Sequence, residues 1–538
     1  MAHVNKNMKN ETHISNTAKL INNVDERKKR NYHMILIFAV LCILPFLVRY
    51  LQYESKLNQF PWFPDQIYSE DFFLLLKQRF FLLISSAMAL YLLYAVIRKK
   101  RLKDSKIFIP LAVYAMLTIL STIFSKYRTF SLTGSYDMFE SVFVLLGYCV
   151  AAYYTYQILN EEKDFRYVYY FIVILSLIMG IMGTFQYLGY DFFSTELGKN
   201  LILPYEIRKL GYDVDFVPNS VYLTLLNPNY VGMLCSLLIP VLLVMTLMYK
   251  KVLWTILSII SVITLTISLV GSKSLTGVIA VALAVICILI IMWRYLIKYF
   301  YITLTVLIII IAAAYFTYNY TNHYFSNKVK AQMNISRTEP ALSSIETKDD
   351  MVTLTYKGNE INLVFVLNSD NTAEILAFDQ NYAAIESTFD YETGVYTITD
   401  ERFAGLIYGF DEEIDGVFYV NVWGKKWRFT NLTDDQTYYC LNRFYKLDKM
   451  VNPPAVFRGY EIFGSYRGYI LSISIPLLKK SILLGTGPDT FVLYFPQNEY
   501  LAFYRASIES SIINKPHNMY LQIGIQTGVL SLIAYIMF

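Results

Sequence analysis

Charge and cysteine are scarce in this chain of 538 residues. Only 17% of the residues are charged, 55% are hydrophobic, and the mean hydropathy is +0.38. A soluble enzyme is excluded, because one soluble domain cannot bury that much apolar surface. Four of the five cysteines lie within apolar runs, and the chain has no CxxC pair. The sequence therefore supports no extracytoplasmic disulfide, no zinc site and no redox motif.

Long apolar runs are abundant instead. A bilayer needs about 20 consecutive apolar residues per helix, and ten runs approach that length, at about 34–50, 80–97, 107–124, 139–159, 167–188, 221–248, 252–270, 275–292, 297–316 and 518–538. No small-residue cleavage site follows the first run, which predicts an anchor helix behind a polar tail of residues 1–33. The predicted fold is mainly α, a polytopic membrane helix bundle. Because the last run reaches Phe538, we expect a bundle truncated from about twelve spans.

The distribution of Lys and Arg predicts the topology. Threading the runs alternately places four basic clusters on one side, at 27–30, 98–106, 250–251 and 294–298. By the positive-inside rule that side is the cytoplasm. The loops 51–79, 189–220 and above all 317–517 then lie outside. The chain is predicted to be a multi-pass protein of a bacterial cytoplasmic membrane, with a helical bundle over 34–316.

One segment of the outer loop differs in composition and pattern. Residues 345–448 hold 19 of the 42 acidic residues and 8 of the 47 basic residues, a net charge of −11. Short alternating runs such as Val352–Tyr356 and Ile361–Phe365, separated by Lys357-Gly358, are typical of β-hairpins. The runs Gly416–Trp423 and Trp427–Phe429 repeat this pattern around Gly424. We predict a small antiparallel β-domain at about 348–446 that spaces or shields the membrane site. An amphipathic interfacial helix is predicted at about 461–480.

A group of motifs lies near the end of the chain and at two earlier turns. Leu483–Phe491 contains a GxGPxxF turn, and His517-Asn518 precedes Gly528 by a nine-residue spacer. Arg467 opens the preceding helix, Leu226–Tyr230 reads LNPNY, and Gly271–Lys273 reads GSK. In order and spacing, over roughly residues 110–538 apart from the β-insert, the chain resembles the O-antigen ligase and O-antigen polymerase family.

This resemblance implies a metal-independent membrane glycosyltransferase that needs no cofactor. The donor is a polyprenyl-pyrophosphate-linked oligosaccharide, and a hydroxyl of a glycan acceptor attacks its anomeric carbon outside the membrane. Such a reaction needs a base and fixed cations, which predicts His517 and Arg467 as catalytic residues. Lys273, Asn227, Asn229 and Asn518 are the predicted substrate-binding residues. The expected partners are this donor, the acceptor and the lipid bilayer, with no nucleic acid.

Each predicted cation or base has a structural alternative. His517 could cap a helix or lie at the interface, and Arg467 could extend along apolar surface toward water. Lys273 stands where the family usually has arginine, so the bidentate geometry is lost. Near Glu140 the family often has an arginine, but this chain has Asp137-Met138, which leaves one expected phosphate contact unassigned.

The polar turns have alternatives as well. Asn227-Pro228-Asn229 could bind substrate or only cap a helix. Gly485-Thr-Gly487 could present N–H groups to phosphate but is more often a tight turn. Asp213 and Asp215 resemble a metal-binding carboxylate pair, and without a supporting cluster we interpret them as loop acids.

Two other classes of protein compete with the enzyme. A transporter or flippase of lipid-linked glycan would show internal repeats and charged or broken helices near the bilayer midplane, and the sequence shows no repeat. A sensor or scaffold could use the β-domain to bind wall glycan. Within the enzyme class the motifs do not separate polymerase from ligase. The abundance of Tyr, Lys, Asn and Ile is typical of an AT-rich genome and fits a Gram-positive source. Such a source lacks the lipopolysaccharide core that a ligase would use as acceptor, which favours a polymerase of capsular or wall polysaccharide.

Overall fold

The computed structural model describes residues 32–99, 102–211, 220–225, 227–249, 251–298, 323–333, 340–369 and 372–538. They divide into two compact units, each considered by itself. The first lies within 1–52, 70–112 and 143–330, and the second within 53–69, 113–142 and 331–538. The basic cluster at 27–30 and most of the run at 297–316 lie outside the described residues.

Apolar helices make up most of the first unit. Among the described residues, four are long and apolar enough to cross a membrane: α2 (Leu75–Ile97), α6 (Glu162–Tyr187), α9 (Pro228–Met248) and α10 (Val252–Gly271). Shorter apolar helices of 10–17 residues cover Tyr32–Phe46, α5 (Val142–Ile158), α11 (Leu275–Ile291) and α3 (Phe108–Phe124), most of which belongs to the second unit. The remaining elements before the second unit's strands are β1 (Leu51–Glu54), β2 (Tyr68–Asp71), α4 (Arg128–Thr133), η3 (Phe192–Ser194), α7 (Glu196–Ile202), α8 (Tyr205–Lys209), α12 (Trp293–Lys298) and α14 (Tyr324–Met333).

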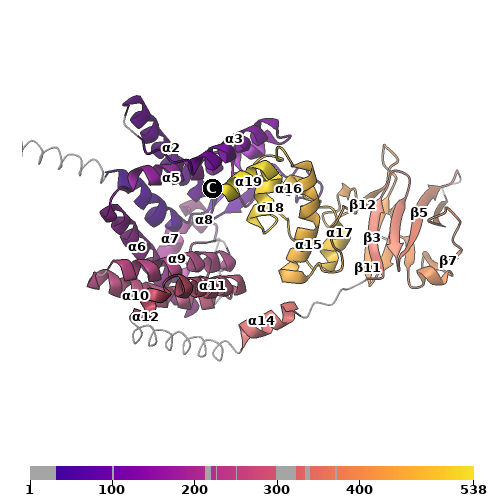
Figure 1. The fold of residues 1–538 in the computed structure, drawn as a ribbon. Coiled ribbons are helices and arrows are strands. Elements are labelled where there is room, and N and C mark those ends of the chain that lie inside the picture. The colour runs from indigo at the N-terminus through magenta and orange to yellow at the C-terminus, as the bar shows by residue number, and fades with distance from the viewer. Residues whose placement is uncertain are drawn as a thin grey trace, which may run out of the picture. The chain divides into compact units, whose positions relative to one another are not determined.

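Small residues let the first unit's helices approach closely. α6 packs on α10, and α9 packs on α10 and α11 (Figure 1). A Cβ added at Gly180 of α6 would lie 2.2 Å from Thr264 Oγ1 of α10, and one at Gly277 of α11 would lie 2.6 Å from Gly232 Cα of α9. Without a hydrophobic driving force between helices in lipid, such close backbone contact is a main source of helix association.

Eleven consecutive antiparallel strands form two sheets in the second unit. The four-stranded sheet has the order β3-β4-β5-β6, and the seven-stranded sheet has the order β13-β12-β11-β10-β9-β8-β7. The strands are β3 (Leu342–Thr347), β4 (Val352–Tyr356), β5 (Asn359–Leu367), β6 (Ala373–Asp379), β7 (Ser387–Asp390), β8 (Val395–Ile398), β9 (Ile407–Phe410), β10 (Phe418–Val422), β11 (Lys425–Thr430), β12 (Tyr439–Leu441) and β13 (Leu447–Asp448). Their inner faces share one hydrophobic core, in which Phe365 of β5 stacks on Phe418 of β10.

Two predicted hairpins are confirmed with their turns. Tyr356 pairs with Asn359 across Lys357-Gly358, and Val422 pairs with Lys425 across Trp423-Gly424. All four turn residues have positive φ, between 48° and 80°. Two-residue hairpin loops with positive φ at both positions match the right-handed twist of the strands, and a glycine at the second position favours them.

The chain returns to helices after the strands (Figure 1). They are α15 (Phe463–Leu477), the short turn η5 (Leu478–Lys480), α16 (Phe491–Tyr494), α17 (Tyr500–Arg505), α18 (Met519–Gln526) and α19 (Val529–Met537). α15 buries Tyr469, Ile470 and Ile473 in a core with α16, α17 and Ile525 of α18. This core holds the segments that carry the GxGPxxF and His-Asn motifs.

Where the sequence predicts one helix from about 518 onward, the structure has two. Gly528, with φ of 109°, separates α18 from α19. A Cβ there would lie 2.8 Å from the carbonyl oxygen of Leu483, and Val529 N donates to Ser481 O at 2.9 Å. The helix breaks because the backbone just before the GxGPxxF turn occupies the space that the next turn of α18 would fill. The spacing of apolar residues does not predict which glycine adopts a positive φ, so the sequence argument missed this break.

Candidate functional site

The structure divides the six predicted site residues between the two units. Arg467, His517 and Asn518 belong to the second unit, whereas Lys273, Asn227 and Asn229 belong to the first. Each group is therefore described separately.

His517 and Arg467 influence each other electrostatically. Partial removal of the imidazole from water by the surrounding protein lowers the pKa of His517, and the positive charges of Lys515 and then Arg467 lower it further, to about 4. The side chain is itself exposed, so solvent screens part of the charge interactions. Because the pKa is shifted downward, the imidazole is neutral at neutral pH. A neutral imidazole can accept a proton.

The backbone at this pair has an unusual conformation. His517 has φ of 51°, and Tyr466, directly before Arg467, has φ of 67°. Positive φ is uncommon for residues other than glycine and is concentrated at functional sites, where surrounding contacts impose it. The following residue, Asn518, is the N-cap of α18, and its Oδ1 accepts from Leu521 N at 3.1 Å. Asn518 thus caps the helix that begins directly after His517 and Asn518, and its predicted contact with substrate stays a prediction.

A buried carboxylate, Asp489 of the GxGPxxF turn, joins the loop before α5 to this site. Its Oδ2 accepts from Ser135 N at 2.5 Å and from Glu140 N at 2.9 Å. Asp489 is 2% exposed. Burial, reinforced by the charge of Glu140 and opposed by that of Lys515, raises the pKa of Asp489 to about 7. The residue therefore holds the loop that carries Glu140 in place.

Glu140 and Lys515 belong to the same group of charges. Gln522 Nε2 of α18 donates to Glu140 Oε2 at 2.7 Å, and the charge of Lys515 acts on Glu140, Asp489 and His517 alike. The sequence argument did not identify Asp489 or Lys515 as site residues. The available signal was their position inside the two strongest motifs, GTGPD and KPHN. The family often has an arginine near Glu140, which this chain lacks. Lys515 supplies a positive charge near Glu140 in its place.

The glycine turn closes against backbone. Thr486 N donates to Ile525 O at 2.9 Å and Gly487 N donates to Gln526 O at 2.8 Å. A Cβ at Gly485 would lie 2.2 Å from the backbone of Gln526. The alternative in which these N–H groups bind phosphate is therefore wrong for Thr486 and Gly487, because α18 already accepts both.

We expect Gly487→Ala to destabilise the second unit by about 3 kcal/mol, from positive φ and overpacking. The added Cβ would lie 2.4 Å from Ser131 Oγ and 2.5 Å from Ser125 Oγ, at φ of 110°. The matched control is Gly394→Ala, where φ is 65° and no atom lies within 4 Å, so only about 1 kcal/mol is expected. Thermal unfolding of the detergent-solubilised variants measures both. Equal shifts in Tm would contradict this account.

The first unit's predicted residues lie at helix ends. Asn227 is the N-cap of α9, its Oδ1 accepts from Asn229 N at 2.9 Å, and Pro228 takes the first helical position. The capping alternative is therefore realised for this pair, although both side chains remain exposed. Lys273, exposed and with φ of 54°, lies in the turn Ser272–Ser274 between α10 and α11.

The starts of α9 and α11 lie against each other. A Cβ at Gly232 would lie 2.3 Å from Ser274 Oγ, so the α10–α11 turn and the first turns of α9 are neighbours. Lys273 and the Asn227/Asn229 pair are thereby brought to one region of the first unit. Whether they bind substrate stays a prediction.

Asp213 and Asp215 are outside the described residues. Within the described ranges, no group of three or more His, Cys, Asp or Glu side chains is arranged to hold a metal ion.

Comparison with protein-family models, with curated proteins and with solved structures finds no match to the chain.

Proposed function

We propose that the chain is an integral-membrane glycosyltransferase. It transfers a polyprenyl-pyrophosphate-linked oligosaccharide to a hydroxyl of a glycan acceptor outside the cytoplasmic membrane, as a polymerase of surface polysaccharide. The observation that carries this proposal is the grouping of a neutral His517 with the cations Arg467 and Lys515 next to the N-terminus of α18.

The proposed chemistry needs both functions of this group. The acceptor hydroxyl gives its proton to the neutral imidazole of His517 while its oxygen forms a bond to the anomeric carbon. The bond from that carbon to the pyrophosphate oxygen breaks, and its electron pair leaves with the pyrophosphate. Arg467 and Lys515 stabilise the departing charge, the arginine through paired N–H donors. The partial positive charge of the α18 N-terminus adds to this effect. Lys273, Asn227 and Asn229 are proposed substrate-binding residues of the first unit.

The neighbouring acids fit the same proposal. The charge of Lys515 acts on Glu140 and Asp489 as well, and the Asp489 hydrogen bonds fix the loop beside it. A bound pyrophosphate offsets Arg467 and Lys515, so it should raise the pKa of His517 toward its ordinary value. The base would then become stronger once the donor is bound.

The membrane part of the proposal is a bundle of about ten spans with residues 317–517 outside. The four membrane-length helices support membrane insertion, and the Lys/Arg asymmetry supports the orientation.

We expect a cysteine at Asn368, which is exposed on the outer β-region, to react with an impermeant maleimide in intact cells. A Cys287→Ser background removes the exposed natural cysteine. A control cysteine at Lys163, in the first turn of α6 at its predicted cytoplasmic end, should react only after the cells are opened. The reverse pattern of labelling would contradict the proposed orientation.

The proposed function is tested by transfer from polyprenyl-pyrophosphate glycan to an oligosaccharide acceptor, using purified detergent-solubilised protein. Elongated glycan and released polyprenyl pyrophosphate are both expected, with a chelator present. If activity is lost with chelator and returns with a divalent ion, a metal mechanism involving Asp213 and Asp215 replaces this one. Movement of lipid-linked glycan across proteoliposomes without transfer would favour a flippase.

A further inference from the structure

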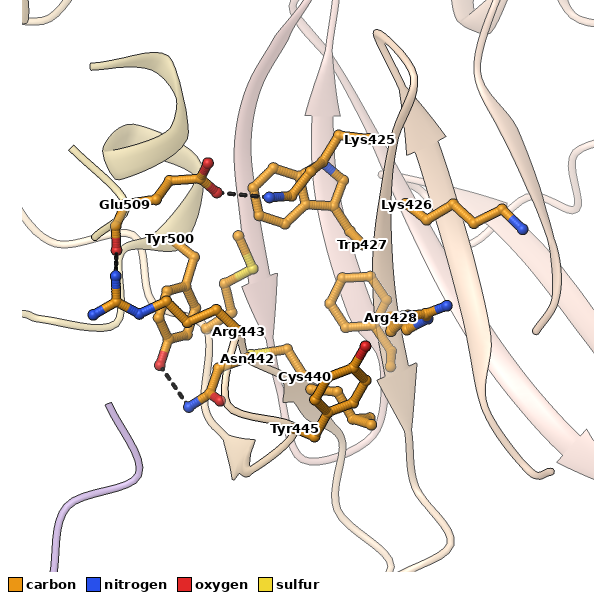
Figure 2. Close-up of a pocket in the computed structure, with 13 residues that line it drawn as sticks. Lys425, Lys426, Trp427, Arg428, Cys440, Asn442, Arg443, Tyr445, Tyr500 and Glu509 are labelled. Atoms are coloured by element: carbon orange, nitrogen blue, oxygen red, sulfur yellow. Dashed lines mark hydrogen bonds and ion pairs between the residues drawn. The ribbon is translucent and has the colours of Figure 1, made fainter. Parts of the chain in front are cut away.

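A pocket of about 190 Å³ lies on the seven-stranded sheet, apart from the residues discussed so far. Its walls come from β11, from β12 and the turn that follows it, and from Tyr500 and Glu509. All of these belong to the second unit. Figure 2 shows Lys425, Trp427 and Arg443 gathered on one side with Glu509, and Tyr445 on the other.

The charge of this pocket is opposite to that of its surroundings. Residues 345–448 carry only 8 basic residues and a net charge of −11, yet four of those basic residues line the pocket: Lys425, Lys426, Arg428 and Arg443. The acidic residue among the lining residues is Glu509. Cations gathered at one place favour the binding of an anion there, whereas the rest of this acidic segment repels anions.

Two of these cations form no direct ion pair with any residue that the structure describes, although Lys426 lies within electrostatic range of Asp411 and Arg443 within that of Glu509. Lys425 pairs with Glu509 at 2.6 Å, and Arg428 pairs with Asp411 at 2.7 Å. In the part of the chain that the structure describes, Lys426 and Arg443 form no ion pair: Lys426 lies over the ring of Tyr419, and Arg443 donates to the backbone oxygen of Glu509. Arg443 therefore keeps N–H donors for a ligand carboxylate.

Aromatic side chains supply the second half of a saccharide site. Tyr445 lines the pocket and is 66% exposed. Trp427 is only 7% exposed, and its buried indole N–H has no hydrogen-bond partner among the described residues. A buried donor left unpaired is costly, so a ligand hydroxyl at Trp427 would be favoured. Aromatic faces pack on the apolar faces of sugar rings while their polar edges bond hydroxyls.

We propose that this pocket binds an acidic saccharide, one or two sugar units bearing a carboxylate, within the glycan that the enzyme elongates. The carboxylate pairs with Arg443, and the ring packs on Tyr445 with a hydroxyl at Trp427. As a role in elongation this rests on the proposed function, and it names the substrate class: a polysaccharide that contains uronic acid. The β-region then holds the glycan chain instead of only shielding the membrane site.

The experiment uses the full chain in detergent and isothermal titration calorimetry. The probe is a glucuronic-acid-containing tetrasaccharide, and its matched control is the carboxyl-reduced analogue, which keeps the rings and loses the charge. We expect the acidic form to bind about tenfold more tightly or better. Arg443→Gln should weaken it about tenfold, and Trp427→Phe, which removes only the N–H donor and part of the ring, should also weaken it. Lys357→Gln, outside the pocket on the same segment, is the control and should bind normally.

The outcomes separate this inference from the proposed function. Equal binding of the reduced analogue, equal binding of polyglutamate, no binding at all, or normal binding by Arg443→Gln would each overturn the pocket assignment. His517→Ala should bind the tetrasaccharide normally, because the pocket is distinct from the base. If wild-type protein binds the acidic tetrasaccharide but transfers no glycan, the pocket stands and the glycosyltransferase proposal fails. If it transfers glycan but does not bind the tetrasaccharide, the reverse holds.

Discussion

His517→Ala should lower kcat by about 10²- to 10⁴-fold, the range expected for losing a general base, while the donor still binds. The neutral imidazole is the group near Arg467 and Lys515 that can take the acceptor proton. Turnover and donor affinity should be measured separately, since a lost base changes kcat and a lost binding contact changes affinity. The control is His323→Ala, a histidine of the same predicted outer loop. Full activity in His517→Ala would remove it from the mechanism.

The pH dependence follows from the lowered pKa of His517. An ordinary histidine loses its neutral form below about pH 6.5, whereas the lowered pKa of His517 in the free protein keeps its imidazole neutral at lower pH. The acidic limb of kcat/KM, which reports the free enzyme, should therefore fall well below pH 6.5. Lys515→Gln removes a positive charge near the imidazole, so the limb should move to higher pH. A limb that does not move in this variant would show that Lys515 does not act on the base.

Arg467→Ala should lower kcat/KM by about 10²- to 10³-fold, as expected for removing a charge-stabilising donor, and should weaken donor binding as well. Arg467→Lys should recover only part of this loss, because lysine keeps the charge but not the paired N–H donors. Lys480→Ala, exposed just after α15, is the control for a general loss of positive charge.

A second readout separates a substrate contact from a structural role. Arg467→Ala removes a positive charge near His517, so the pKa of His517, followed by NMR of labelled imidazole, should rise. Equal donor affinity in wild type and Arg467→Ala, with unchanged Tm, would contradict the pyrophosphate assignment.

Local chemistry made much of the fold predictable. Apolar runs gave the ranges of α2, α3, α5, α6, α9, α10 and α11 to within a few residues at most ends. Glycine at the second turn position marked both hairpins, and Asn227 before Pro228 marked the start of α9. These features depend on neighbours in the sequence, and the sequence displays them.

The arrangement of the site depends on distant residues instead. The hydrogen bond from Ser135 N to Asp489 joins residues 354 positions apart, and the one from Gln522 to Glu140 spans 382 positions. No local pattern reports which loop a buried aspartate will hold. The resemblance identified the motifs His517-Asn518 and GxGPxxF, but the contribution of Lys515 became visible only when the charges around His517 were in place.

The break at Gly528 bears on which length changes the chain can tolerate. Surface loops usually accept an inserted residue, and the connection from Ser481 to Thr486 resembles one. Its carbonyls, however, accept from Val529 and Leu530 at the start of α19, so its length is tied to the position of that helix. One residue added here would shift every acceptor and leave the first N–H groups of α19 unpaired. We expect natural variants to keep this connection at constant length, while the turn at Gly394 varies freely.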